Sequence, residues 1–239
     1  EGLLEESRAD LNRSIEDYNY MLSLLEHNNI DFFSKDFNEV IKYRTQIDTV
    51  TVKSEEIIAF YSLKIQKLQN RIKVIPSIMD DKENSTSLRA YDYVLNAKES
   101  LGKIRALLSE GFANRIDTHT LQTLVAYLEV YKQNSYNFQT IVSKNILTFY
   151  DTIFNDKAIE KTFGIIENVL NDSSYKTNSL LWFDESTKAI NLLNKVEKEI
   201  FNNVTASINT KINFMSYKIT TLLLFLGITL VSIALLMMN

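Results

Sequence analysis

Residues 97–112, AKESLGKIRALLSEGF, include Lys98, Gly102 and Arg105 in a pattern that could bind a small anion. On a helical wheel, Arg105 and Lys98 fall along one edge of the apolar face, and Gly102 lies beside them. A guanidinium group offers a planar fork of donors that matches a small oxyanion, and such charge-assisted hydrogen bonds are strong. A glycine lets a ligand or a neighbouring helix approach the backbone. The pattern therefore predicts Arg105 as the main anion ligand, with Lys98 assisting it beside Gly102.

The same residues also permit a purely structural interpretation. Arg105 could extend its charge to the surface and pair with a carboxylate of another helix, and Gly102 could serve close packing alone. Both residues are unfavourable at these positions. A glycine inside a helix costs about 0.5–1 kcal/mol relative to alanine, and an arginine near a core needs a counter-charge. The structural interpretation requires an acid beside Arg105 and no space beside Gly102.

Other kinds of chemistry find little support in the sequence. The 239 residues include no cysteine, and the two histidines, His27 and His119, have no ligands nearby at metal-binding spacing. We find no glycine-rich phosphate loop, no acidic metal-binding loop and no recognisable pairing of a nucleophile with a base. The sequence therefore predicts no enzyme, no metal and no cofactor. The formal net charge of −4 gives no reason to expect a nucleic-acid partner.

Long helices are the elements that must position these residues. One proline and five glycines in 239 residues, of which 45% are hydrophobic, leave little room for turn-rich β-structure. Apolar residues recur at helical spacing, and short polar turns between helices indicate antiparallel bundles. We expect helices over residues 3–26, 35–52, 54 to about 75, 88 to about 111, 118–153, 157–170 and from 182 onward, with residues 80–87 as a polar connection.

The last of these helices has two distinct parts. Apolar residues recur every three or four positions from residue 193 to residue 215, as on the packed face of a helix. Residues 219–239 then carry no charge, and about 20 apolar residues span the hydrocarbon core of a bilayer. We therefore expect a sensor domain over residues 1–214 and a transmembrane helix over 215–239. A continuous helix from residue 182 would be roughly 80 Å long; it could carry a mechanical signal or serve only as an anchor.

Four stretches of the chain resemble the nitrate- and nitrite-sensing (NIT) domain family. The hallmark of this family reads roughly Lys-Glu-x-x-Gly-x-Glu-Arg-Ala, and KESLGKIRA at residues 98–106 matches it except that Ile104 replaces the second glutamate. The other three stretches are YRTQID at 43–48, FYSLKIQKL at 60–68 and LWFDESTKAINLLNKVEKEI at 181–200. Together the resemblance covers most of residues 1–205.

The resemblance implies an all-α fold of two up-and-down antiparallel helical bundles, in which nitrate or nitrite binds between helices through Arg105. The family has a second arginine in a Glu-Arg-Gly segment of the first helix. SRADLN at residues 7–12 offers Arg8 as its counterpart, although the distance from Arg8 to YRTQID better suits a later Gln-Arg segment of that helix. In the second case the Glu-Arg-Gly segment lies upstream of Glu1, and the chain is truncated at its N-terminus.

These observations predict the ligand-sensing region of a bacterial transmembrane receptor, most specifically a methyl-accepting chemotaxis protein. The sensor domain would lie in the periplasm, anchored in the inner membrane, and would act as a homodimer that signals through its final helix. One alternative is a helical sensor for a different small ligand, which Ile104 favours. Another is a structural or dimerising bundle that is anchored in the membrane and binds no small molecule.

Overall fold

A computed structural model describes residues 2–24, 34–49, 51–172 and 175–237, and these residues form nine helices and no strand. The prediction of an all-α fold is confirmed. The chain divides into two compact units, residues 1–65 and 66–239.

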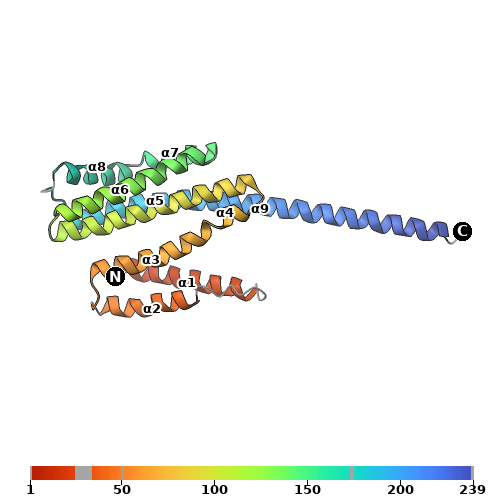
Figure 1. The fold of residues 1–239 in the computed structure, drawn as a ribbon, viewed down its shortest axis with the longest axis horizontal. Coiled ribbons are helices and arrows are strands. Elements are labelled where there is room, and N and C mark those ends of the chain that lie inside the picture. Colours follow the sequence, from red (N-terminus) through yellow and green to blue (C-terminus); the bar gives the residue numbers. More distant parts are fainter. Residues whose placement is uncertain (1, 25–33, 50, 173–174, 238–239) are drawn as a thin grey trace. The chain divides into compact units, whose positions relative to one another are not determined.

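The N-terminal unit contains α1 (Gly2–Leu24), α2 (Ser34–Asp48) and the first part of α3 (Ser54–Ile72). These helices run alternately in opposite directions (Figure 1). Ile15 of α1 and Val40 of α2 are buried, and the rings of Tyr43 and Phe60 stack with their centroids 3.9 Å apart. Apolar contacts of this kind hold α2 against α3.

The second unit is an up-and-down bundle. It contains the end of α3, α4 (Ile75–Ile78), α5 (Lys82–Ala113), α6 (Thr118–Ile141), α7 (Lys144–Phe154), α8 (Lys157–Asn171) and α9 (Ser179–Met237). Figure 1 shows α5, α6, the consecutive pair α7 and α8, and α9 running alternately in opposite directions. α5 packs most extensively on α6 and α9. One apolar core joins these helices, and it includes Leu101, Ile104, Leu108, Leu124, Ile166 and Trp182.

Two helices begin earlier than predicted, and capping explains both. α5 begins at Lys82 within the predicted polar connection, because the side chain of Asp81 accepts hydrogen bonds from the backbone N–H groups of Glu83 and Asn84 (3.2 and 3.4 Å). α9 begins at Ser179 rather than near residue 182, because the side-chain oxygen of Asn178 accepts a hydrogen bond from the Leu180 N–H (2.8 Å).

The helix predicted over residues 118–153 is in fact two helices. Val142 and Ser143 adopt extended backbone between α6 and α7, with ψ near 151° at both positions. The break lets α7 turn back along the bundle and bury Ile146, Tyr150 and Ile153. Packing of α7 against the core therefore interrupts a stretch whose local sequence suits a continuous helix.

α9 is continuous over its 59 residues and projects beyond the bundle of the second unit (Figure 1). Its apolar stripe is buried from Leu193 to Val204, whereas Ile212 and Met215 are exposed. Among the residues described, no helix offers a stretch long and apolar enough to cross a membrane. The side chains of residues 226–239, most of the predicted transmembrane segment, lie outside the described residues, so that segment stays a prediction.

Candidate functional site

Arg105 lies where α5 faces the first turns of α9. Its Nη1 donates a hydrogen bond to the Thr187 hydroxyl (2.9 Å), and its guanidinium carbon lies 4.9 Å from the centre of the Phe183 ring. Phe183 and Thr187 are four residues apart, and therefore share one face of α9. The side chain of Arg105 is partly buried between the two helices.

Arg105 has no acidic partner in the part of the chain that the structure describes. Burial lowers the pKa of its guanidinium from the ordinary value, because the charged form is partly removed from water. The two acids at the start of α9 are paired with lysines instead: Asp184 with Lys188 (2.6 Å), and Glu185 with Lys188 and Lys161 (3.2 and 3.4 Å). The acid that the structural interpretation requires is therefore absent from the described residues.

Trp182 fixes α9 against α5 at this point. Its indole N–H donates to the backbone carbonyl of Arg105 (2.9 Å), and the Ser109 hydroxyl donates to the same oxygen (2.7 Å). The Trp182 side chain is fully buried and meets the Phe112 ring edge-on, with centroids 6.1 Å apart. The position of Phe183 and Thr187 opposite Arg105 follows from this anchor.

Gly102 has free space beside it. A Cβ atom built on Gly102 would meet no described atom within 4 Å outside its own helix. Gly111 differs, because a Cβ there would lie 2.9 Å from Cγ1 of Ile116, at the close approach between the end of α5 and the following loop. Close packing therefore explains the glycine at position 111 but not the one at position 102. The open space beside Gly102 lies one turn of α5 from Arg105.

Lys98 is already paired. Its ammonium group forms an ion pair with Glu197 of α9, and the Tyr91 hydroxyl donates to the other oxygen of the same carboxylate (3.1 Å). Burial and the charge of Glu197 raise the pKa of Tyr91, which keeps its hydroxyl protonated as a donor. Lys98 thus ties α5 to α9 two turns from Arg105, with its charge balanced by Glu197.

Arg8 belongs to the N-terminal unit, where it forms a two-pronged pair with Asp48: Nη2 to Oδ1 at 2.6 Å and Nη1 to Oδ2 at 3.1 Å. This hydrogen bonding raises the pKa of Arg8 and lowers that of Asp48. Arg44 of the YRTQID segment is different, because its Nη1 donates to Asn12 (2.8 Å) while its buried Nη2 has no hydrogen-bond partner. Our sequence interpretation did not single out Arg44, although it noted the segment.

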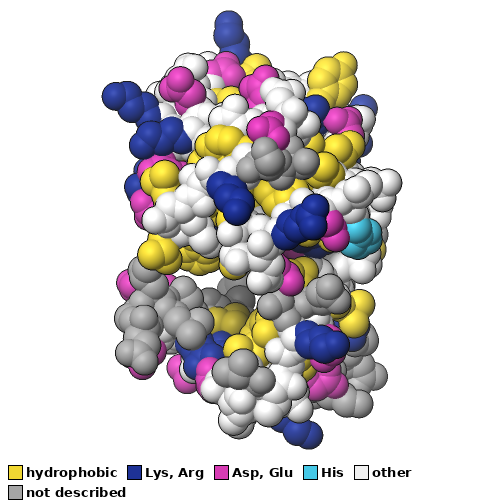
Figure 2. Space-filling view, turned by 90° about the vertical axis from the view of Figure 1, so that its left-hand side faces the viewer, with side chains coloured by type: hydrophobic (Ala, Val, Ile, Leu, Met, Phe, Trp, Pro, Cys, Tyr) yellow, Lys and Arg dark blue, Asp and Glu magenta, His cyan; other side chains and the backbone are white. Residues whose placement is uncertain are grey.

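A cationic hollow lies at the end of the second unit where α5 connects to α6. Its volume is about 330 Å³, and the side chains that line it include Arg115 and Lys176 but no acid among the residues described. Figure 2 views this end, where lysine and arginine side chains are interspersed with acidic and uncharged ones. We also find no cluster of three metal-ligating side chains in the described stretches.

The described residues therefore form an all-helical domain in which Arg105 lies at the contact between α5 and α9. A family model described as nitrate and nitrite sensing matches residues 1–205, and the chain belongs to this family. The family is sensory rather than enzymatic. No match was found among curated proteins or among solved structures.

Proposed function

We propose that this domain binds nitrate or nitrite at Arg105, in the space beside Gly102 between α5 and α9. The observation that carries the proposal is the state of Arg105. It is partly buried, it donates to a neutral hydroxyl, and no described acid balances its charge. A small anion supplies the missing negative charge, and its planar oxygens match the guanidinium fork.

Thr187 and Phe183 connect this site to the final helix. The Thr187 oxygen accepts from Arg105, which leaves its own hydroxyl proton free to donate to an anion. An anion at Arg105 therefore changes the contacts that Arg105 makes with Thr187 and Phe183 of α9. Because α9 continues without interruption to Met237, a small displacement at its start moves its far end.

The receptor context completes the proposal. The uncharged stretch of residues 219–239 supports a transmembrane helix, and with it a periplasmic sensor in a bacterial inner-membrane receptor of the chemotaxis type. The exposed apolar side chains of α9 beyond the bundle, including Ile212, Phe214 and Met215, support a homodimer that buries them against a second copy. Arg8 is paired with Asp48 within the N-terminal unit, so it would bind an anion only by giving up that pair.

A different small ligand is the second candidate, and Ile104 favours it. Ile104 occupies the place of the hallmark glutamate and is fully buried in the core between the helices of the second unit. A carboxylate cannot be buried there without a partner, so the local environment differs from the one that the hallmark implies. This difference bears on which anion the site selects.

Thermal unfolding with nitrate, nitrite, chloride and sulfate tests the proposal. A ligand at about 100 times its dissociation constant adds about 2.7 kcal/mol of stability, which corresponds to a rise of roughly 5–11 °C in a chain of this size. We expect nitrate or nitrite to produce this rise, and Arg105→Gln to abolish it.

Arg115→Gln is the matched control. Arg115 is an exposed arginine of the same unit, and it lines the cationic hollow where α5 connects to α6. It should leave the nitrate response unchanged. A response that survives in Arg105→Gln but disappears in Arg115→Gln would move the site to that hollow. A response to sulfate or chloride alone would favour the second candidate.

A further inference from the structure

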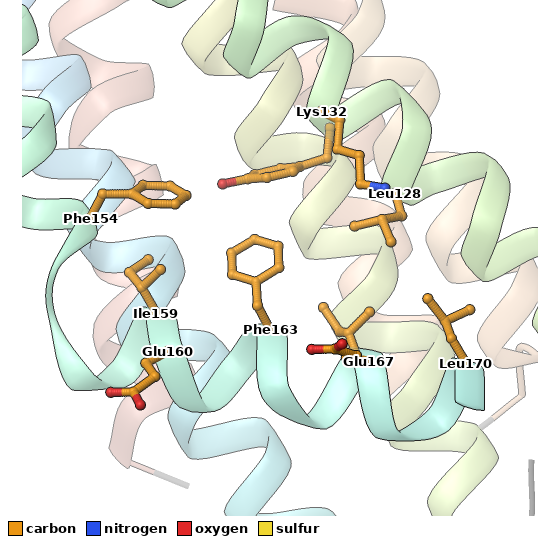
Figure 3. A pocket seen from close by; sticks show the side chains of 10 residues that line it. Leu128, Lys132, Phe154, Ile159, Glu160, Phe163, Glu167 and Leu170 are labelled. Carbon is orange, nitrogen blue, oxygen red and sulfur yellow. The ribbon is translucent and has the colours of Figure 1, made fainter. Parts of the chain in front are cut away.

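A larger pocket lies between α6 and α8, near the end of α7. It has a volume of about 550 Å³, within the range of small-molecule sites in proteins. In Figure 3 the side chains of Phe154, Ile159 and Phe163 point into one shared space. The Phe163 ring lies 5.1 Å from that of Tyr131 and 6.1 Å from that of Phe154, centroid to centroid, so three aromatic rings form a continuous wall.

The unbalanced charge at this pocket is negative. Glu160 and Glu167 of α8 line it, and neither forms an ion pair with any residue that the structure describes. The one cation in the lining, Lys132, pairs with Glu129 (3.0 Å). An inorganic anion therefore has no reason to bind here, which separates this pocket from the proposed nitrate site.

Tyr131 contributes its ring, and not its hydroxyl, to the pocket. The hydroxyl is buried and lies beside the hydroxyl groups of Ser135 and Tyr150. The pKa of Tyr131 is raised, chiefly by burial, so the hydroxyl stays neutral. At Tyr131 the pocket therefore offers a ligand an aromatic face and no charge.

We propose that this pocket binds an organic ammonium cation with an apolar or aromatic body. The body packs on the wall of Tyr131, Phe154 and Phe163, whose ring faces also attract cations. The ammonium group faces the free carboxylates of Glu160 and Glu167. Away from the pocket, α8 buries Ile165 and Val169 in the core and reaches α9 through the Lys161–Glu185 pair, so occupancy here acts on the same final helix as the anion site.

Three probes of similar shape and different charge test this inference on the whole chain: 2-phenylethylamine, 2-phenylethanol and phenylacetate. We expect titration calorimetry and thermal unfolding to detect the amine and to detect neither the alcohol nor the acid. The double variant E160Q/E167Q should weaken amine binding about tenfold, since two exposed charge pairs contribute together about 1.4 kcal/mol. Phe163→Leu, which keeps apolar volume but removes a ring, should also weaken it.

Glu110→Gln is the control, because Glu110 is an exposed carboxylate near the end of α5 and does not line the pocket. It should bind the amine as the parent chain does. Equal binding of the alcohol, binding unaffected by E160Q/E167Q, or no binding of the amine would each overturn the inference. Nitrate binding should be unchanged in these variants, since none of them alters Arg105 or Gly102, so the two proposals can be tested separately.

Discussion

Replacing Gly102 with alanine should make the ligand-free protein more stable and the nitrate response weaker. Gly102 lies inside α5, where alanine is favoured over glycine by about 0.5–1 kcal/mol. The added methyl group would meet no described atom within 4 Å, so no steric cost offsets this gain. The expected rise in melting temperature is roughly 1–4 °C. The same methyl group occupies the space through which we propose that the anion approaches.

Two other glycines calibrate the measurement. Gly164 lies inside α8 and also has free space, so Gly164→Ala should give a similar gain in stability with no change in the nitrate response. Gly111→Ala places a methyl group 2.9 Å from Cγ1 of the buried Ile116, and it should destabilise the protein by about 1–3 kcal/mol. Urea unfolding of the three variants, with and without saturating nitrate, gives the change in stability and the change in the nitrate response for each variant.

The outcomes for Gly102→Ala separate the steps of the reasoning. A loss of stability would mean that the space beside Gly102 is filled in solution. A gain in stability with an undiminished nitrate response would mean that the anion does not approach the backbone at this turn. Only a gain in stability together with a weaker response, and the absence of that weakening in Gly164→Ala, supports the site as proposed.

Two carboxylates of α5 and its cap should give pH dependences of opposite sign. The hydrogen bond from Lys211 lowers the pKa of Asp81 in the folded protein. The ionised Asp81 carboxylate therefore stabilises the fold above the unfolded pKa of about 3.9. This stabilisation is lost as the pH falls through the lower pKa of the folded state. Asp81→Asn keeps a capping oxygen and should flatten the acid limb of a melting-temperature profile below about pH 4; an unchanged limb would refute the pairing. Burial raises the pKa of Asp92, whose Oδ1 is buried without a hydrogen bond. Protonated Asp92 therefore contributes to folding stability at low pH, and this contribution is lost as the pH rises through the raised pKa of the folded state. Asp92→Asn should therefore raise the melting temperature at pH 7 but not at pH 3, and an equal effect at both pH values would argue against the raised pKa.

Much of the helical architecture was predictable from spacing alone, and the errors in the predicted helix boundaries have identifiable physical causes. The periodic apolar residues of α9 and α8 indicated helices that the structure contains. The break at Val142 and Ser143 was not predictable, because no glycine or proline marks it and the Ser143 side chain makes no capping hydrogen bond. Burial of Ile146 and Tyr150 favours the break, and that is a tertiary effect.

The sequence singles out Lys98 and Arg105, but the partners of these two side chains were not predictable. Both Lys98 and Arg105 sit at the edge of the apolar face of α5, and nothing in their own helix distinguishes them. The difference lies in α9, where the antiparallel packing places Glu197 opposite Lys98 and Thr187 opposite Arg105. That register depends on the Trp182 anchor, which a helical wheel of one helix does not contain.

The contrast between these two cations also indicates the direction of the conformational signal. At Lys98 the fold supplies its own carboxylate, so an added anion would have to compete with Glu197. At Arg105 the fold accepts a partly desolvated charge with which no described acid pairs, and the surrounding core of Leu101, Ile104 and Trp182 stabilises the helices enough to keep it there. An anion at Arg105 removes this unfavourable electrostatic contribution while the α5–α9 contact stays in place. Ligand binding should therefore tighten α9 against α5 rather than release it, because the anion would balance the charge of Arg105, which no described acid balances.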